Sequence, residues 1–172
     1  MALSANKKLG FIIASVIIPF IVYTFVYYKK EIAVYFPKDK WVSMNFQYGE
    51  GEYSSEWDTE RGEFVTSLFG DSITKIKMPL LPAEADTIWR MMEEVEFFKY
   101  PSNLEFPVGT KSDTVELIQY KYEMRFIHRT KFLTWEKHLF TENQKATDLR
   151  KLSRLVRRII SDKPEFREIA GE

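Results

Sequence analysis

The stretch WVSMNFQYGEGEYSSEWD, residues 41–58, has the pattern of two consecutive β-strands. In residues 41–48 every second side chain is apolar, and a period of two is typical of a half-buried strand. The apolar positions are Val42, Met44, Phe46 and Tyr48. Glycines at 49 and 51 indicate a turn, and Glu52–Asp58 follows as a second strand. The stretch therefore predicts the first hairpin of an antiparallel sheet.

The chain after this hairpin predicts two more strands and then a helix. Glu63–Phe69 and Ser72–Met78 complete an antiparallel meander. Pro82–Phe98 is predicted as a helix, because proline is favoured in the first turn and apolar residues then recur at helical spacing. These residues are Ala85, Ile88, Met92 and Val95. Phe97 and Phe98 are expected to fix the end of this helix to the sheet.

The last third of the chain repeats this order. Thr114–His128 and Phe132–Phe140 are rich in β-formers and predict a hairpin that turns at Arg129–Lys131. Ala146–Ser161 predicts a final helix, whose apolar face consists of Leu149, Leu152, Val156, Ile159 and Ile160. The order of strands, helix, strands and helix indicates an α+β fold, with a small antiparallel sheet and two packed helices.

An apolar run from Leu9 to Tyr28 precedes the domain and contains no charged residue. Twenty helical residues span about 30 Å, the thickness of the hydrocarbon core of a bilayer. Lysines flank both ends, and tyrosines gather at the second end. The run predicts a single transmembrane helix with Pro19 near its middle. The resulting division is a tail at 1–8, an anchor at 9–28, a stalk at 29–40 and a globular domain at 41–172.

A cleaved signal peptide is the alternative interpretation of this run. Signal peptides usually have a shorter apolar core that ends in small residues, whereas this run continues into Tyr27, Tyr28 and two lysines. The short tail with Lys7 and Lys8 resembles a bacterial uncleaved signal anchor, which places the domain outside the cytoplasm. The flanking lysines nearly balance across the run, so the positive-inside rule alone leaves the orientation open.

Composition excludes several classes of protein. The 25 basic and 25 acidic residues cancel, so no overall positive field favours nucleic-acid binding. The absence of cysteine excludes disulfides, thiol catalysis and lipid attachment through an N-terminal cysteine. No glycine-rich phosphate loop is present. We expect no cofactor, no metal, no small-molecule substrate and no nucleic-acid partner.

The motif FGDSIT at residues 69–74 resembles the nucleophile block of GDS-type serine esterases and lipases. In that family a histidine oriented by an aspartate activates the serine. Here that serine is Ser72, but the family's Gly-x-Asn-Asp and Asp-x-x-His blocks have no counterpart. A hydrolase that uses Ser72 is therefore the alternative function, and a hairpin turn at Gly70 and Asp71 is the preferred interpretation.

Two other patterns are weak metal signals. Asp58-x-Glu60-x-Gly62 contains only part of a calcium loop, which needs five or more oxygen ligands. His128 and His138 lie on predicted neighbouring strands, but no third ligand is evident. A solvated strand face and two partly exposed histidines are the simpler interpretations.

Charge is distributed unevenly along the chain, which suggests two surfaces of opposite sign. An acidic cluster comprises Glu50, Glu52, Glu56, Asp58, Glu60 and Glu63, and a basic cluster comprises Arg150, Lys151, Arg154, Arg157 and Arg158. The basic helix face could meet anionic lipid, although a solvated face is preferred. The four tryptophans are expected in the core; they are Trp41, Trp57, Trp89 and Trp135.

Residues 80–98, which follow a Gly-Asp turn and a strand, resemble a recurring unit of uncharacterised bacterial envelope proteins. In that unit a helix ends in a phenylalanine pair, as at Phe97 and Phe98 here. Residues 152–166 resemble the final helix of the same proteins. Many of these proteins are lipoproteins, whereas this chain has no lipid-bearing cysteine. The resemblance implies an extracytoplasmic α+β domain and no catalytic residues.

These observations together predict a membrane-anchored, non-catalytic domain that binds a protein partner. It is expected to contact the bilayer through residues 9–28 and to serve as an accessory subunit of a membrane complex or as an immunity or inhibitor protein. In the second form the acidic stretch would cover a basic site on a toxin.

Overall fold

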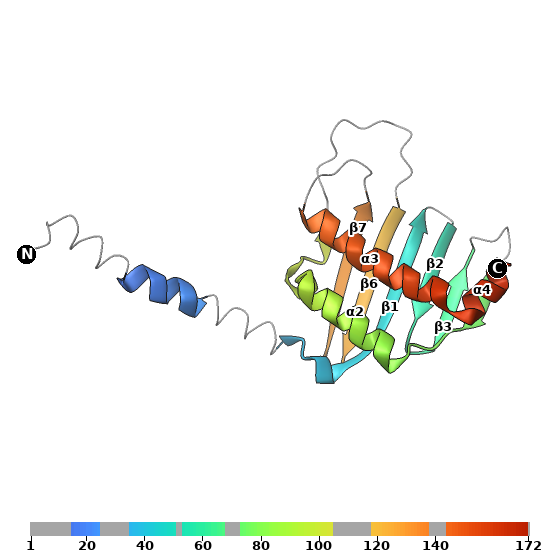
Figure 1. Ribbon diagram of the computed structural model, residues 1–172, viewed down its shortest axis with the longest axis horizontal. Helices are drawn as coiled ribbons and strands as arrows, with labels where there is room; N and C mark the ends of the chain where they lie inside the picture. The colour runs from blue at the N-terminus through green and yellow to red at the C-terminus, as the bar shows by residue number, and fades with distance from the viewer. Residues whose placement is uncertain are drawn as a thin grey trace, which may run out of the picture. The chain divides into compact units, whose positions relative to one another are not determined.

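The computed structural model describes residues 15–24, 35–50, 53–67, 73–104, 118–137 and 144–171 (Figure 1). The chain divides into two units, residues 1–37 and Lys38–Glu172. In the first unit residues 15–24 are helical, and the Thr24 hydroxyl donates a hydrogen bond to the Phe20 carbonyl at 2.8 Å. Within the described ranges no helix has both the length and the hydropathy of a membrane span. The rest of the predicted anchor, the whole tail and residues 29–34 of the stalk lie outside these ranges.

The second unit contains one sheet with the strand order β4-β3-β2-β1-β6-β7-β5. Its strands are β1 (Trp41–Glu50), β2 (Tyr53–Asp58), β3 (Glu63–Thr66), β4 (Thr74–Lys77), β5 (Asn103–Leu104), β6 (Ile118–Phe126) and β7 (Arg129–Lys137). Every neighbouring pair is antiparallel except β5 and β7, which are parallel. The α+β class is confirmed, but the prediction of a purely antiparallel sheet is wrong. β5 has only two residues, too few to show a period in the sequence.

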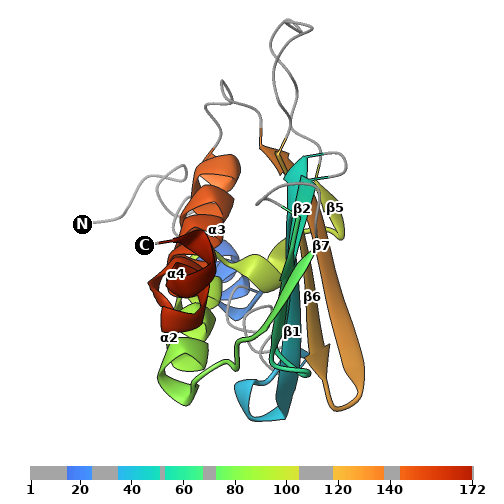
Figure 2. The same ribbon diagram turned by 90° about the vertical axis from the view of Figure 1, so that its right-hand side faces the viewer.

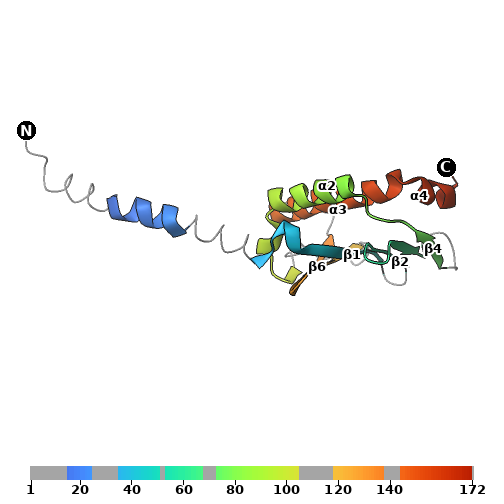
Figure 3. The same ribbon diagram turned by 90° about the horizontal axis from the view of Figure 1, so that it is seen from below.

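Three α-helices accompany this sheet in the described part of the second unit. They are α2 (Pro82–Glu94), α3 (Gln144–Asp162) and α4 (Pro164–Ala170), with short 3-10 turns η1 (Lys38–Lys40) and η2 (Phe97–Lys99). All three α-helices lie on one side of the sheet (Figures 2 and 3). The prediction of two packed helices missed α4. Pro164 follows α3, but it also occupies the first position of α4, where its fixed backbone angle is favoured.

The first predicted helix is too long, because α2 ends at Glu94 and not at Phe98. Glu96 has a left-handed backbone conformation with φ of 54°, which stops the helix before η2. Phe97 is fully buried, and its ring centre lies 5.5 Å from that of Tyr122 on β6. The phenylalanine pair therefore contacts the sheet from a 3-10 turn.

The second hairpin turns at Ile127 and His128, and not at Arg129–Lys131 as the sequence suggested. Phe126 pairs directly with Arg129, so residues 129–131 belong to β7. The side chains of β6 that face the helices are Tyr120, Tyr122, Met124 and Phe126. The alternate residues Lys121, Glu123 and Arg125 of β6 face away from the core.

The core lies between the sheet and the helices. It includes Met44, Phe46 and Tyr48 of β1, as predicted, but Val42 is 58% exposed. The pairing of β1 with β6 shifts between Trp41 and Ser43, and this irregularity turns Val42 away from the core. Three of the four tryptophans are buried, as expected, and Trp41 is partly exposed.

Candidate interaction surface

The side of the sheet opposite α2, α3 and α4 carries a continuous set of polar side chains. Successive strand residues point to opposite faces, so every second residue of β1, β2 and β6 points away from the helices. We call this side the open sheet face; its central residues are Asn45, Gln47, Glu56, Asp58, Lys121, Glu123 and Arg125. Antiparallel sheets commonly have one packed and one solvated face.

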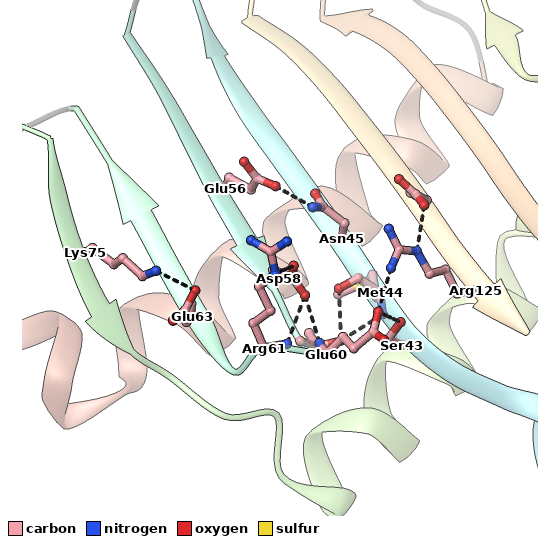
Figure 4. A network of polar contacts seen from close by, with 12 residues as sticks. Ser43, Met44, Asn45, Glu56, Asp58, Glu60, Arg61, Glu63, Lys75 and Arg125 are labelled. Atoms are coloured by element: carbon pink, nitrogen blue, oxygen red, sulfur yellow. Dashed lines mark hydrogen bonds and ion pairs between the residues drawn. The ribbon is translucent and has the colours of Figure 1, made fainter.

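Arg125 lies at the centre of a polar network on this face (Figure 4). Its Nη1 lies 2.6 Å from Oε2 of Glu60, and its Nε lies 2.7 Å from Oε1 of Glu123. The hydrogen bond and charge of Glu123, followed by those of Glu60, raise the pKa of the Arg125 guanidinium. Ser43 on β1 donates a weaker hydrogen bond to Glu60 at 3.5 Å. One guanidinium therefore links β6 to the turn after β2, across β1.

The turn at residues 59–62 holds Glu60 in position for this contact. Oδ1 of Asp58 accepts hydrogen bonds from the amides of Glu60 at 2.9 Å and Arg61 at 3.1 Å. The Thr59 hydroxyl accepts from the Met44 amide at 2.7 Å and donates to the Met44 carbonyl at 2.9 Å. Gly62 has a φ of +62°, a left-handed conformation that suits glycine.

This turn contains the pattern that resembled part of a calcium loop. The Asp58 carboxylate accepts hydrogen bonds from backbone amides, and the Glu60 carboxylate forms an ion pair with Arg125. A search of the described residues finds no group of three or more acidic or histidine side chains that could hold a metal ion. In the part of the chain that the structure describes, these carboxylates therefore organise a turn and an ionic network.

The acidic cluster is not a uniformly negative surface. Glu63 forms an ion pair with Lys75 of β4 at 2.8 Å, and Asp58 forms one with Arg61 at 3.4 Å. Glu56 accepts a hydrogen bond from the Asn45 side-chain amide. Glu52 and the side chain of Glu50 lie outside the described residues. The cations come from β4, β6 and the turn, so only the folded sheet brings them beside the carboxylates.

The basic cluster lies on α3, on the other side of the sheet. The guanidinium of Arg157 lies 5.0 Å from the centre of the Tyr48 ring, a cation–π distance, and burial raises the pKa of Tyr48. Lys151 pairs with Asp148 at 3.2 Å, and Arg158 pairs with Asp162 at 3.5 Å. The basic side chains of this cluster lie on α3, and Lys151 and Arg158 are offset by carboxylates of the same helix, as the acidic cluster is offset by cations.

The other candidate residues give no assembled site. Ser72 and His138 lie outside the described residues, so the structure shows no geometry for the serine motif or for the histidine pair. His128 is exposed in the turn between β6 and β7. In the core, the Tyr122 hydroxyl and the Ser153 hydroxyl lie 2.8 Å apart and form a buried hydrogen bond. Burial raises the pKa of Tyr122 well above its usual value, which keeps its hydroxyl neutral.

Sequence reasoning missed Arg125 and Glu123. A signal was available, because the alternation in residues 118–126 places both residues on the face opposite the buried tyrosines. The contact of Arg125 with Glu60 had no local signal, since it depends on the pairing of β1 with both β2 and β6.

No model of a protein family matches the chain, and a search of curated proteins finds no match.

Proposed function

We propose that this protein is a single-pass, membrane-tethered and non-catalytic interaction protein, whose domain lies outside the cytoplasm and binds a protein partner through the open sheet face. The observation that carries the proposal is the ordered polar network centred on Arg125, on a side of the sheet that α2, α3 and α4 leave uncovered. The uncharged run of residues 9–28 supports the tether.

Two residues of the open sheet face, Phe132 and Arg125, belong to types that are enriched at protein interfaces. Phe132 of β7 is 51% exposed and pairs with Glu123, so its ring lies on this face. Arg125 pairs with Thr130 on the same two strands. Aromatic residues and arginine are enriched among the residues that dominate binding energy at interfaces. Because Arg125 is already held by two carboxylates, little side-chain entropy is lost when a partner contacts it.

Between the two forms of this function, the charge balance favours an accessory subunit of a membrane complex. An immunity protein that covers a basic site with its acidic stretch needs carboxylates that are free to meet cations. Here Glu60 and Glu63 are paired with Arg125 and Lys75. A partner with mixed charges and an apolar contact for Phe132 matches the surface better.

The proposal is tested by crosslinking the tagged full chain in native membranes and identifying stoichiometric partners. We expect Phe132→Ala to reduce recovery of the partner roughly tenfold, the effect of losing about 1.4 kcal/mol of binding free energy. The matched control is Ile73→Ala, because Ile73 is also an exposed apolar residue, at 75%, but precedes β4 at the edge of the sheet. Absence of a stoichiometric partner, or equal recovery with both variants, would refute the proposal.

A further inference from the structure

The outer surface of α2 and α3, called here the helix layer, carries two opposite charges side by side. The exposed carboxylates of α2 include Asp86, Glu93 and Glu94, against one exposed arginine, Arg90. The exposed cations in the middle of α3 are Lys151, Arg154, Arg157 and Arg158. The two helices contact each other on the same side of the sheet (Figure 1).

The two helices run antiparallel, which fixes how their charges align. Lys163, just after α3, forms an ion pair with Glu84 in the first turn of α2 at 2.9 Å. At the other end, burial raises the pKa of Tyr100, and the nearby charges of Asp148 on α3 and of Glu96 just after α2 raise it further. Arg158 is therefore level with the start of α2, and Arg154 and Lys151 are level with its end.

From this arrangement we infer that the helix layer binds the helix layer of a second copy of the chain. A two-fold axis parallel to the helices places α2 of each copy on α3 of the other, so the same patch serves both subunits. Glu93 and Glu94 then face Arg154 and Lys151 of the second copy, and the start of α2 faces Arg158; Asp86 in that part of α2 already forms an ion pair with Lys38 of its own chain at 2.8 Å. The dimer therefore contains two contacts between an acidic α2 and a basic α3, one for each α2.

The charge pattern favours a second copy over a polyanion. An anionic membrane or a nucleic acid would attract α3 but repel the carboxylates of α2 beside it, and like charges brought together cost several kcal/mol. Among the described residues Glu93, Glu94 and Arg154 form no ion pair, so they can pair between copies without breaking an existing bond. The inference concerns the side of the sheet opposite the open face and does not depend on the partner proposed above.

A charge-swap experiment tests this inference with the full chain. Variant A carries Arg154→Glu and Arg158→Glu, and variant B carries Glu93→Lys and Glu94→Lys. All four residues are exposed, so the core is unchanged. Two differently tagged chains are co-expressed, extracted in detergent and captured through one tag, and light scattering gives the mass of the protein complex.

We expect wild type to pair with wild type. The amount of the second chain captured should fall roughly tenfold or more for A with A and for B with B, because like charges then face each other. A with B should pair as well as wild type, since both opposed helix pairs again have opposite sign. The control, Lys77→Glu on the edge strand β4, should leave pairing unchanged. Salt at about 1 M, where the screening length is about 3 Å, should weaken wild-type pairing.

Several outcomes would overturn the inference. A monomeric wild type would do so, as would failure of A with B to pair while both variants keep wild-type circular dichroism. Pairing that neither variant nor salt changes would assign association to another part of the chain. Binding of the full chain to anionic vesicles that variant A loses, without self-association, would assign α3 to lipid.

Discussion

Lys163 lies at a junction of three segments and is nearly inaccessible to solvent. Its side chain is 8% exposed, and Nζ donates to the Pro79 carbonyl at 2.8 Å and to the Glu84 carboxylate at 2.9 and 3.0 Å. Nζ also lies 5.7 Å from the centre of the Trp57 ring. A buried ammonium requires such partners, because its removal from water is costly. Lys163 therefore fixes the end of α3, the start of α2 and the segment after β4 to one another.

We predict that Lys163→Met lowers the free energy of unfolding by about 2 kcal/mol, because the Pro79 carbonyl and the Glu84 carboxylate lose their donor. Glu84 is 21% exposed, so water partly compensates and the loss is smaller than for a fully buried pair. Urea denaturation of the full chain, followed by tryptophan fluorescence, measures the change.

Lys151→Met is the control for this prediction, since Lys151 is 49% exposed and pairs with Asp148 on the surface of α3. Its loss should stay within about 0.5 kcal/mol. Equal effects of the two substitutions would contradict the role given to Lys163.

At the residue scale the sequence predicted apolar burial better than polar contacts. Trp57, Trp89 and Trp135 are buried as expected, and the partly exposed Trp41 lies tilted against Trp89, with the two ring centres 5.7 Å apart. The burial of Lys163 was not predictable, because its partner Glu84 is distant in the sequence and a lysine beside a helix is usually solvated.

The end of α2 is the element boundary that the sequence predicted least well. Glu96 adopts φ of 54° immediately after the C-cap residue Val95, a position where glycine is usual. Its amide donates to the Glu93 carbonyl at 3.1 Å, as in a helix-terminating motif. A glutamate gives no sequence signal for this stop, so the predicted helix continued to Phe98.

We predict that Glu96→Gly raises the free energy of unfolding by about 0.5–1 kcal/mol, because glycine adopts the left-handed conformation without strain. Thermal unfolding followed by circular dichroism measures the gain. Glu96→Ala is the control: it removes the same surface ion pair with Lys99 but keeps a Cβ, so no gain is expected. A gain of equal size in both variants would mean that the carboxylate, and not the backbone, is responsible.

Element type was predictable for long periodic segments, and element limits were not. β1, α3 and the meander from β1 to β4 follow from alternation and helical spacing. The turn at Ile127 and His128 contains neither glycine nor asparagine, so the sequence showed no turn there. β5 and the parallel pairing depend on the path of the chain after η2, which no local pattern encodes.

At the scale of the whole molecule, three tyrosines in the core contain hydroxyls that resist ionisation. Burial raises the pKa of Tyr48, Tyr100 and Tyr122 above the ordinary value of 10.0. Above about pH 10 the unfolded chain therefore loses phenolic protons that the folded chain retains. Since the unfolded state then binds fewer protons, the free energy of unfolding falls as pH rises.

We predict that the contribution of these tyrosines to stability is complete below about pH 10 and decreases from there through the raised pKa values of the folded state. Urea denaturation at a series of values from about pH 9 to about pH 12 measures the slope. Tyr122→Phe removes one of the three groups and should make the fall shallower.

Lys131 provides a control of opposite sign, because burial lowers its pKa below the ordinary value of 10.5. Between the lowered pKa and 10.5 the unfolded chain holds the lysine proton more tightly than the folded chain does, so this group makes the free energy of unfolding rise with pH. Lys131→Met should therefore make the fall steeper. A pH profile that neither substitution changes would contradict the assignment to these buried groups.

The candidate interaction surface was only partly predictable at this scale. The acidic and basic clusters are visible in the sequence, and the basic one lies on α3 as expected. The sequence did not show that cations neutralise the acidic cluster. Arg125 and Lys75 contact Glu60 and Glu63 only when β6 and β4 have joined the sheet.

Because β1 lies between β2 and β6, one of its edges has no partner strand while the chain is being synthesised. Translation proceeds at about 5–20 residues per second, so β1 to β4 are complete several seconds before β6 begins at Ile118. During this time the edge of β1 that later pairs with β6 has no partner strand, and unpaired edges are prone to wrong association. We therefore expect a stalled or truncated chain that ends before Ile118 to need a chaperone, although it contains α2 and five of the seven sheet strands.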